Sequence, residues 1–334
     1  MHILVTGGAG YVGSHTVRWL LQSGHEVWVY DDLSQGHRSS VPKDRLFQGP
    51  LSDTQCLKSV MAQLPIETVI HFAAHSLAGE SVHSPEKYWT NNVQGTECLL
   101  KTMRECQVTR IVFSSTCAVY GASPAVPIRE TTPLKPITPY GETKLACERL
   151  LQQFSEEHDF ATLALRYFNA AGASPSGELG EDHDPETHLI PCILQTALRQ
   201  RPYVDIFGTD YPTHDGTTIR DYIHVDDLAA AHSLGIENVV PGQFLAYNLG
   251  TGTGHSVREV IATAETVTGT SIPVKEKPQR PGDPPELVAS ATKIQREMGW
   301  KPQYGSLKSI LETAWKWHLS HPHGYDDAHS KSNT

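Results

Sequence analysis

The chain has little positive charge for its length and contains no long hydrophobic run. Its 334 residues include 27 Lys and Arg against 37 Asp and Glu, which gives a net charge of −10. Because nucleic acids attract basic surfaces, this balance argues against a nucleic-acid partner. Apolar runs stay well below the roughly 20 residues that span a bilayer, so we expect no membrane partner. The first expected strand begins at His2, so we also expect no signal peptide.

Patterns of paired cysteines and of metal ligands are also absent. None of the 18 histidines falls in an H-E-x-x-H or mixed Cys/His spacing, so the sequence predicts no metal ion. The cysteines show no C-x-x-C spacing, and several lie in apolar segments, which is typical of reduced thiols in a cytoplasmic protein. They are Cys56, Cys98, Cys106, Cys117, Cys147 and Cys192. The chain shows no internal repeat and no low-complexity tract.

A glycine-rich turn near the N-terminus is the first positive signal. The branched apolar run His2–Thr6 is typical of a buried strand, and a helix-like stretch follows the glycines. Gly8, Gly10 and Gly13 match G-x-G-x-x-G, and Gly7, Gly10 and Gly13 match the variant G-x-x-G-x-x-G. Such a turn lets the backbone approach a pyrophosphate, whose charge the helix N-terminus then stabilises. We therefore expect a dinucleotide to lie against Gly7, Gly10, Tyr11, Val12 and Gly13.

Two acids at the end of the next strand indicate which dinucleotide binds. The strand-like run Glu26–Tyr30 is followed by Asp31 and Asp32, roughly 20 residues past the glycines. Carboxylates there accept hydrogen bonds from the two ribose hydroxyls of NAD and repel the 2′-phosphate of NADP. Arg38 lies nearby, but the paired acids favour NAD as the cofactor.

A hydroxyl group, a phenol and an ammonium group form the expected catalytic set. Tyr140 and Lys144 are four residues apart, which places both on one face of a helix. An ammonium near a phenol lowers its pKa, so Tyr140 is expected to remove a proton from a sugar hydroxyl. Thr116 ends a strand-like run, where its hydroxyl faces the ligand crevice of an open α/β sheet. The plainer alternative is that Thr116 completes a turn and Tyr140 packs on the sheet.

The order of elements predicts an α/β fold. Strand-like runs near 2–6, 26–30, 67–72, 109–114 and 161–167 alternate with helical stretches near 12–23, 54–63, 84–106 and 140–158. This alternation predicts right-handed βαβ units in a Rossmann-like, doubly wound parallel sheet. Beyond residue 172 the alternation is less regular. We expect an NAD-binding domain at 1–171, to which segments near 220–250 return, a smaller α/β substrate domain at 172–325, and a disordered tail at 326–334.

Motifs along the whole chain support a resemblance to a known family. Besides the glycine turn and the Thr116/Tyr140/Lys144 set, they include Val69-Ile-His-Phe-Ala73, Asn91-Asn-Val-Gln-Gly-Thr96, Leu165-Arg-Tyr-Phe-Asn169, Asp215-Gly-Thr-Thr-Ile-Arg220-Asp-Tyr222, Tyr247-Asn-Leu-Gly250 and Arg280-Pro-Gly-Asp283. With these motifs in register over roughly residues 2–325, the chain resembles the extended short-chain dehydrogenase/reductases. Among them it is most similar to the UDP-glucose 4-epimerases, also called UDP-galactose 4-epimerases.

The resemblance implies an activity and a set of binding residues. The reaction would interconvert UDP-galactose and UDP-glucose by oxidation at C4, rotation of the 4-keto sugar and re-reduction, with tightly bound NAD in a homodimer. Thr116, Tyr140 and Lys144 would be catalytic. Phe72, Ala73, Asn91, Ser114 and Tyr167 would join the cofactor contacts. The UDP-hexose would be bound by Asn169, His188, Leu189, Phe207, Arg220, Tyr222, Arg280, Asp283 and Leu287, with the two arginines suited to the phosphates.

Two departures from the family pattern affect what the resemblance implies. Many relatives have an acid after the third strand that contacts adenine, whereas this chain reads Gln48-Gly-Pro-Leu-Ser-Asp53. Leu287 falls where some members have a tyrosine that narrows the sugar pocket. Because leucine leaves more room, UDP-N-acetylhexosamines and UDP-pentoses stay open as alternative substrates.

Other function classes make different demands on the same residues. Dehydratases of this fold carry an Asp-Glu pair directly after the threonine, and here those positions are Cys117 and Ala118. A binding module without activity would not need Tyr140, Lys144 and the glycines together. A simple NAD-dependent dehydrogenase uses the same catalytic set, so the sequence leaves that alternative open.

Overall fold

The computed structural model describes residues 1–123, 125–280 and 282–326, so most of the expected tail at 326–334 lies outside the described residues. A seven-stranded sheet forms the larger part of the molecule, in the order β10-β6-β5-β4-β1-β2-β3. All its neighbouring strands are parallel. Its strands are β1 (His2–Thr6), β2 (Glu26–Asp31), β3 (Leu46–Gln48), β4 (Thr68–His71), β5 (Arg110–Thr116), β6 (Ala161–Tyr167) and β10 (Phe244–Leu249).

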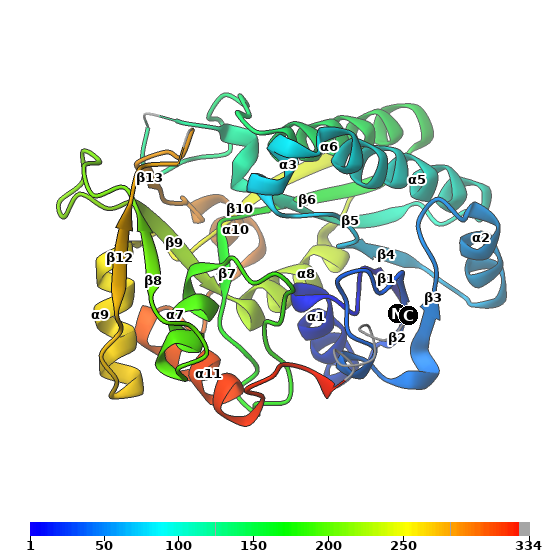
Figure 1. Ribbon diagram of the computed structural model, residues 1–334. Helices are drawn as coiled ribbons and strands as arrows, with labels where there is room; N and C mark the ends of the chain where they lie inside the picture. The colour runs from blue at the N-terminus through cyan, green and yellow to red at the C-terminus, as the bar shows by residue number, and fades with distance from the viewer. Residues whose placement is uncertain (124, 281, 327–334) are drawn as a thin grey trace.

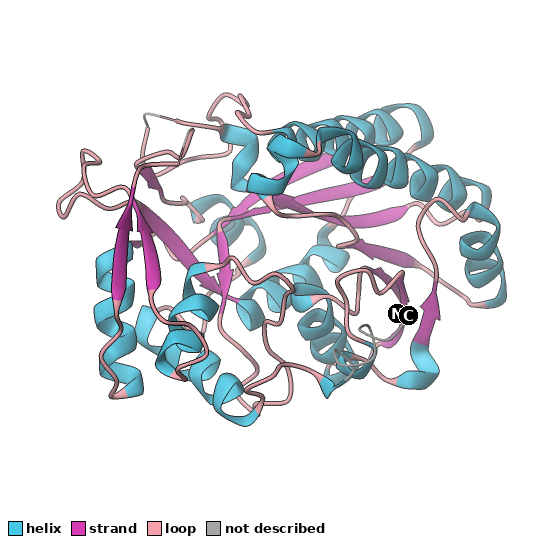
Figure 2. Ribbon diagram, viewed as in Figure 1, coloured by secondary structure: helices cyan, strands magenta, loops and turns pink. Residues whose placement is uncertain are grey.

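Helices cover both faces of this sheet (Figures 1 and 2). One layer contains α2 (Thr54–Gln63), α3 (Ala78–His83), α4 (Pro85–Tyr88), the π-helical turn η3 (Trp89–Gln94), α5 (Gly95–Glu105) and α6 (Pro139–His158). The other contains α1 (Tyr11–Gln22), α8 (Val225–Asn238) and α10 (Thr292–Met298). The order 3-2-1-4-5-6 of the first six strands defines the doubly wound fold. The predicted fold class is therefore confirmed.

Alternating side chains on the strands fill two separate cores. Ile3 and Val5 of β1 point into a cluster with α1 and α8, which includes Leu20 and Leu228. Leu4, between them, points into the opposite cluster with α2, α5 and α6. Such period-2 alternation, with both faces apolar, is what a parallel sheet with helices on both sides requires.

A second unit stands at the carboxyl end of the large sheet and has its own core. Its strands are β7 (Asn169–Ala171), β8 (Val204–Phe207), β9 (Ile219–His224), β11 (Gly254–Ser256), β12 (Val274–Lys277) and β13 (Glu286–Leu287). Strand β9 pairs with β7, β11 and β13, and β8 pairs with β12. Helices α7 (Leu189–Ala197), α9 (Val257–Thr268) and α11 (Leu307–Ser320) pack beside them. Figure 1 shows this unit to the left of the large sheet.

The chain crosses between the two units more than once. Strand β10 joins the large sheet beside β6, and α8 packs against α1, although β9 directly before α8 belongs to the second unit. Short 3-10 turns η1 (Arg38–Ser40), η2 (Lys43–Arg45) and η4 (Cys117–Tyr120) complete the described elements. The domain boundaries expected from the sequence stay a prediction.

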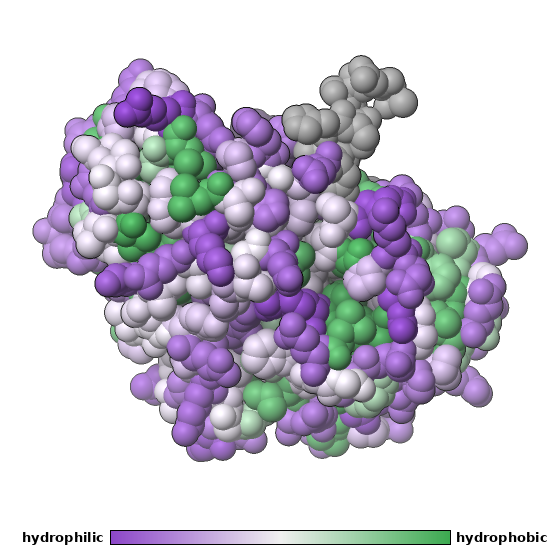
Figure 3. All heavy atoms as spheres, turned by 90° about the horizontal axis from the view of Figure 1, so that it is seen from below, coloured by the Kyte–Doolittle hydropathy of each residue, from purple (hydrophilic) through white to green (hydrophobic). Residues whose placement is uncertain are grey.

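The outer surface is mostly polar on the face that Figure 3 shows, with hydrophobic residues in separate areas. In the described part of the chain, no helix combines the length and the apolar character needed to cross a membrane.

Candidate active site

Tyr140 is positioned by the start of helix α6. Thr138 caps the helix by accepting a hydrogen bond from the Gly141 backbone N–H at 3.2 Å, and Pro139 occupies the first turn. The backbone N–H of Tyr140 donates to the Ser81 hydroxyl at 3.1 Å, which ties α6 to α3. These contacts fix where the Tyr140 side chain enters the cleft.

Gly141 allows α6 to approach the end of strand β5 closely. A Cβ atom at position 141 would lie 2.7 Å from the backbone oxygen of Ala118, in the turn η4 that follows β5. This approach brings Tyr140 to Thr116, the last residue of β5, close enough for the Thr116 hydroxyl to lower the pKa of the Tyr140 phenol. The Thr116 hydroxyl also accepts a bond from the Ala118 N–H at 3.2 Å. The structure therefore places Thr116 and Tyr140 together, as the sequence predicted.

The sequence predicted a lowered pKa for Tyr140, and this is wrong for the protein without bound cofactor or substrate. Burial raises the pKa of Tyr140 above its usual range, and the nearby Tyr167 adds to this, while the Thr116 hydroxyl lowers it. Burial lowers the pKa of Lys144 to about 8. The Lys144 ammonium donates to the backbone oxygen of Ser114 at 2.9 Å and lies 4.8 Å from the Phe113 ring centroid. Desolvation is thus the largest cause of the pKa shift in both Tyr140 and Lys144.

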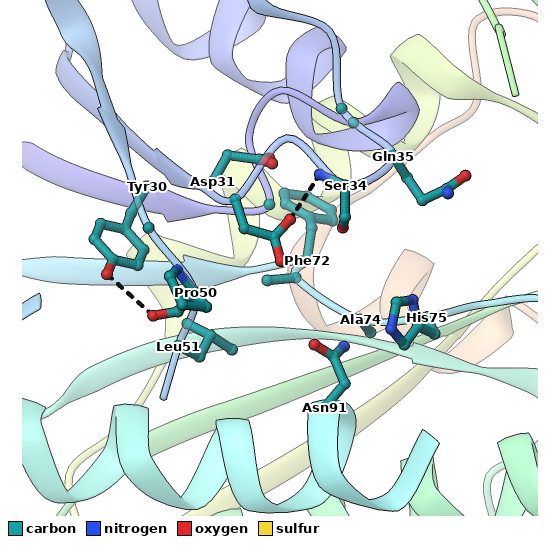
Figure 4. A pocket seen from close by; sticks show the side chains of 16 residues that line it. Tyr30, Asp31, Ser34, Gln35, Pro50, Leu51, Phe72, Ala74, His75 and Asn91 are labelled. Atoms are coloured by element: carbon teal, nitrogen blue, oxygen red, sulfur yellow. Dashed lines mark hydrogen bonds between the residues drawn. The ribbon is translucent and has the colours of Figure 1, made fainter. Parts of the chain in front are cut away.

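The glycine turn and the ends of neighbouring strands form one cavity (Figure 4). Gly7 has φ +72°, and a Cβ there would collide with the backbone of Ala73 after β4. A Cβ at Gly13 would collide with the backbone oxygen of Gly7. Only glycine fits at either position, because the turn and the strand end touch backbone to backbone. Gly7, Gly10, Asp31, Asp32, Gly36, Leu51, Phe72, Ala73, His75 and Asn91 are among the residues that line the cavity.

The two acids at the end of β2 have different surroundings. Asp31 is buried, and its carboxylate accepts from the backbone N–H groups of Ala9 at 2.9 Å and Leu33 at 2.8 Å, so it braces the glycine turn. Asp32 is exposed and accepts from the Ser34 N–H at 2.8 Å. Both line the cavity. A glycine cradle beside two carboxylates fits the pyrophosphate and ribose of a dinucleotide with a free 2′-hydroxyl.

The segment after β3 replaces the acid that many relatives carry with an apolar cavity wall. Pro50 and Leu51 line the cavity, and the Tyr30 hydroxyl donates to the Pro50 backbone oxygen at 3.1 Å. Asp53 does not substitute for the missing acid, because its side chain caps α2 by accepting from the Cys56 N–H at 3.0 Å.

The remaining expected cofactor contacts lie along the same crevice. Asn91 lines the cavity from η3, and Phe72 lines it from the end of β4. Ser114 of β5 and Tyr167 lie on neighbouring strands, where Tyr167 pairs with Thr116, and the hydroxyls of Ser114 and Tyr167 lie 2.5 Å apart. Sequence reasoning gave no role to Asn92, which binds both the N–H and the backbone oxygen of His75 and so holds the loop after β4.

A cluster of expected substrate residues lies in the second unit. Arg220 of β9 forms a salt bridge with Asp283, and the Arg280 guanidinium lies 3.9 Å from the Phe207 ring centroid. Leu287 pairs with Arg220 in register and packs against the cluster that contains Cys117, next to Thr116. The structure thus brings Arg220 to Asp283, 63 positions away and three residues after Arg280.

The other expected substrate residues lie on adjoining elements. Asn169 and Tyr222 face each other in register on β7 and β9. Leu189 begins α7 and packs against the core of the second unit. The His188 ring does not stand by itself, because its Nδ1 atom lies 2.7 Å from a carboxylate oxygen of Glu181. Glu181, His183, Glu186 and His188 form a compact cluster, which the sequence spacing did not reveal.

Comparisons with known proteins agree with this geometry. Residues 3–250 match the model of the NAD dependent epimerase/dehydratase family. A UDP-glucose 4-epimerase of Halalkalibacterium halodurans is 53% identical over 97% of this chain and 98% of its own length. A UDP-glucose 4-epimerase crystal structure superposes with a TM-score of 0.94 at 46% identity, covering 98% of this chain and 100% of that one.

A further structure, the Bifidobacterium longum UDP-glucose 4-epimerase in complex with NAD+ and UDP, has a TM-score of 0.93. It is 37% identical and covers 97% of this chain and 100% of that chain. The fold and the site define an enzyme of the extended short-chain dehydrogenase/reductase type. The chain belongs to the NAD dependent epimerase/dehydratase family, and its relatives in that family are UDP-glucose 4-epimerases. The predicted family and the predicted cofactor NAD are confirmed.

Proposed function

We infer that this enzyme interconverts UDP-galactose and UDP-glucose by reversible oxidation at C4 of the sugar. The observation that carries this function is the buried hydroxyl pair of Tyr140 and Thr116, which lies at the carboxyl edge of the sheet. The Tyr140 ring contacts Tyr88, which contacts His75 of the cavity lining. Arg220 lies near enough to Cys117, directly after Thr116, to lower its pKa. The Tyr140 phenolate can take the proton, and the phenol formed in this way can give it back, which a reversible reaction requires.

The chain's own residues account for binding and proton transfer. Tyr140 exchanges a proton with the C4 hydroxyl, and Thr116 holds that hydroxyl by a hydrogen bond. The Lys144 ammonium donates a hydrogen bond to the Ser114 backbone oxygen at 2.9 Å, which holds its charge near the carboxyl end of β5. When bound, NAD supplies reversible hydride transfer at C4 and the positive charge of its nicotinamide ring. The Lys144 ammonium favours the phenolate form of Tyr140, which accepts the proton of the C4 hydroxyl.

Recognition of UDP is assigned to the second unit. Arg220 and Arg280 carry guanidinium groups suited to bidentate binding of the diphosphate. Asp283 lies beside Arg220 and can accept hydrogen bonds from the ribose hydroxyls. The 4-keto sugar must rotate between the two half-reactions. A tight grip on UDP with few polar contacts to the hexose would permit this rotation.

The buried thiol after Thr116 argues against dehydration. Elimination needs an acid and a base next to the threonine. Burial raises the pKa of Cys117 to about 12, so its thiol stays neutral at physiological pH. Ala118, the next residue, carries no titratable group.

We also propose the domain roles, location and assembly expected from the sequence. Residues 1–171, with β10 and α8, would bind NAD, and residues 172–325 would bind the UDP-sugar. We propose a cytoplasmic homodimer that acts in galactose metabolism. Sedimentation of the purified protein would distinguish a dimer from a monomer.

The first experiment is to incubate the purified protein with UDP-galactose, without added cofactor, and to separate the nucleotide sugars by chromatography. We expect UDP-glucose to form over many turnovers up to a fixed ratio. If UDP-glucose does not form while UDP-N-acetylgalactosamine or a UDP-pentose is epimerised, the proposed substrate is wrong. If added NAD is consumed with net oxidation of the sugar, the enzyme is a dehydrogenase instead.

A further inference from the structure

Four side chains with metal-ligand chemistry converge in the segment between β7 and α7. They are Glu181, His183, Glu186 and His188, and the ligand atoms of all four lie within 4.8 Å of one another. The two carboxylates are buried, with side-chain exposures of 6% and 5%. This 181–188 cluster lies outside the catalytic hydroxyl pair and outside the lining of the dinucleotide cavity, and His188 is its only member among the residues expected to contact the UDP-hexose.

The histidine nitrogens face carboxylate oxygens without making hydrogen bonds to them. The Nδ1 atom of His183 lies 3.4 Å from a Glu181 oxygen and 3.5 Å from a Glu186 oxygen. The Nδ1 atom of His188 lies 2.7 and 3.4 Å from oxygens of the same two residues. Both nitrogens are buried, and neither has a hydrogen-bond partner. Buried polar atoms are normally satisfied, so this arrangement requires an explanation.

The ligand atoms are close enough for one small cation to draw them together, since all four lie within 4.8 Å of one another. Nitrogen and oxygen ligands lie about 2.0–2.2 Å from zinc, so two ligands of a tetrahedral site are roughly 3.3–3.5 Å apart. The Nδ1 atom of His183 lies 3.4 Å from Glu181 Oε1 and 3.5 Å from Glu186 Oε2, and that of His188 lies 3.4 Å from Glu186 Oε1, so Glu186 would bind through one of its two oxygens. The fourth nitrogen–oxygen distance, at 2.7 Å, needs only a small opening of the His188–Glu181 pair.

The net charge of the four side chains and the hydrogen bonds that orient Glu186 are also typical of a metal site. Two carboxylates and two neutral imidazoles leave a net charge of −2, which one divalent cation neutralises. The Glu186 carboxylate is oriented by the backbone N–H groups of Thr187 and His188, both at 2.8 Å. Such bonds to a ligand are the usual outer support of a metal site.

We propose that Glu181, His183, Glu186 and His188 bind one zinc ion in a tetrahedral structural site. All four positions are filled by protein ligands, so the ion has no open position for catalysis. The site would clamp a segment that contacts both units. The His183 ring lies edge-on to Tyr11 of the glycine turn, with centroids 6.3 Å apart, and His188 directly precedes Leu189 of α7. The ion would therefore order the substrate side of the cleft relative to the cofactor side.

The rival explanation is a pair of protonated histidines held by the two acids. The neighbouring carboxylates outweigh burial and raise the pKa of His183 to about 9 and that of His188 to about 10. The geometry favours the metal over this pair, because even the Nδ1 atom of His188, 2.7 Å from a Glu181 oxygen, makes no well-aligned hydrogen bond. Metal binding must release these protons, so the affinity for zinc should rise with pH.

The test is to treat the purified full chain with a chelator, remove the chelator, and titrate it with ZnCl2 and CoCl2 separately. Metal content by mass spectrometry, the visible absorption of bound Co²⁺ and the melting temperature are measured. We expect about one zinc per chain, an intense tetrahedral Co²⁺ spectrum and a higher melting temperature with zinc. None of these measurements depends on turnover, so they stay informative even if the proposed epimerase activity fails.

The matched variants are His183→Gln and His214→Gln. His214 is an exposed histidine that also lies beside two carboxylates, Asp215 and Glu259, but belongs to no such cluster in the described residues. We expect His183→Gln to weaken zinc binding by ~100-fold or more, and His214→Gln to keep it. Glu186→Gln serves as a second variant if the first is misfolded by circular dichroism. The proposal is overturned if the wild-type chain binds no more zinc than His183→Gln, or if bound Co²⁺ has the weak spectrum of octahedral coordination.

Discussion

At Tyr140, burial and the neighbouring Thr116 hydroxyl shift the pKa of the phenol in opposite directions. Burial raises the pKa of the phenol, and the Thr116 hydroxyl lowers it. The sequence revealed the helical spacing of Tyr140 and Lys144, but it could not show how deeply both side chains are buried. For this reason the sequence predicted the catalytic residues without predicting the protonation state of Tyr140 in the protein alone.

Replacing Tyr140 by Phe removes only the hydroxyl that exchanges the proton. Because general acid–base catalysis contributes about 10²–10⁴-fold, we expect kcat to fall by that factor or more while UDP binding is retained. Turnover is measured with UDP-galactose, and UDP affinity by calorimetry. Tyr304→Phe is the matched control, since Tyr304 begins the other Tyr-x-x-x-Lys sequence and stacks on His224 at 3.9 Å. Full activity of the Tyr140 variant would refute its catalytic role.

Leu287 is expected to set the size of the sugar pocket. It packs beside Cys117, which directly follows the catalytic Thr116. Leu287→Tyr should lower kcat/KM for UDP-N-acetylgalactosamine by about 10-fold or more, because the larger ring occupies the space of the acetamido group. The same substitution should change kcat/KM for UDP-galactose far less. Equal losses for both substrates would show that position 287 does not discriminate between them.

At the scale of elements, a buried polar network joins the strands and the helix that carry the site. Glu148 of α6 accepts bonds from Arg166 of β6 at 2.5 and 2.8 Å and from the Ser115 hydroxyl of β5 at 2.5 Å. Arg166 also donates to the Tyr120 hydroxyl at 2.9 Å, which in turn donates to Asn248 of β10. The network fixes α6 against β5, and with it Tyr140 against Thr116.

Breaking this network should be costly, since Arg166 would be left as a buried charge without its acid. We expect Glu148→Gln to lower the free energy of unfolding by about 3–5 kcal/mol in urea titrations. Glu105→Gln removes an exposed ion pair with Lys58, 2.8 Å long, and should change the free energy of unfolding far less, because solvent screens this pair. Similar losses for the two variants would contradict the structural role of Glu148.

Elements held by local patterns were predictable, and those that depend on tertiary contacts were not. The strands at 2–6 and 161–167 agree with the structure residue for residue, because their apolar runs are long and clearly bounded. The single helix expected at 84–106 is instead α4, the π-helical η3 and α5. The side chain of Asn92 within η3 bonds to His75 and to Thr143 of α6, contacts that no local pattern contains. Strand β3, with three residues, was missed for lack of length.

At the scale of the whole molecule, the sequence indicated which strand ends would meet but not which distant side chains would pair. In a parallel sheet the carboxyl ends share one edge, so Gly7, Asp32 and Thr116 could be assigned to one crevice in advance. The pairing of Arg220 with Asp283, 63 positions apart, follows from how β9 and β13 meet. The 181–188 cluster was missed because its E-x-H-x-x-E-x-H spacing matches no common ligand pattern.

Three fully or largely buried histidines should make the molecule sensitive to acid. Burial lowers the pKa of His71 to about 3 and those of His224 and His232 to about 4, against an ordinary value of 6.5. His71 lies between the hydroxyls of Thr6 and Thr96, at 2.7 and 3.0 Å. The folded protein keeps these rings neutral at a pH where the unfolded chain takes up protons.

Below pH 6.5 the unfolded state binds more protons than the folded state, so stability falls as the pH falls toward about 4. Each such histidine contributes a slope of about 1.4 kcal/mol per pH unit in this window. His232 packs against Phe72 and Tyr167 and bonds to the Leu228 backbone oxygen at 2.8 Å. We expect His232→Gln to reduce the slope of unfolding free energy against pH by roughly 1.4 kcal/mol per pH unit, measured in urea titrations from pH 7.5 to 5. The variant is also expected to be less stable than the wild type at pH 7.5. His83→Gln, at an exposed position on α3, is the control and should leave the slope of stability against pH unchanged. An unchanged slope in the His232 variant would contradict the prediction, because it would show that the His232 ring is protonated in the folded state.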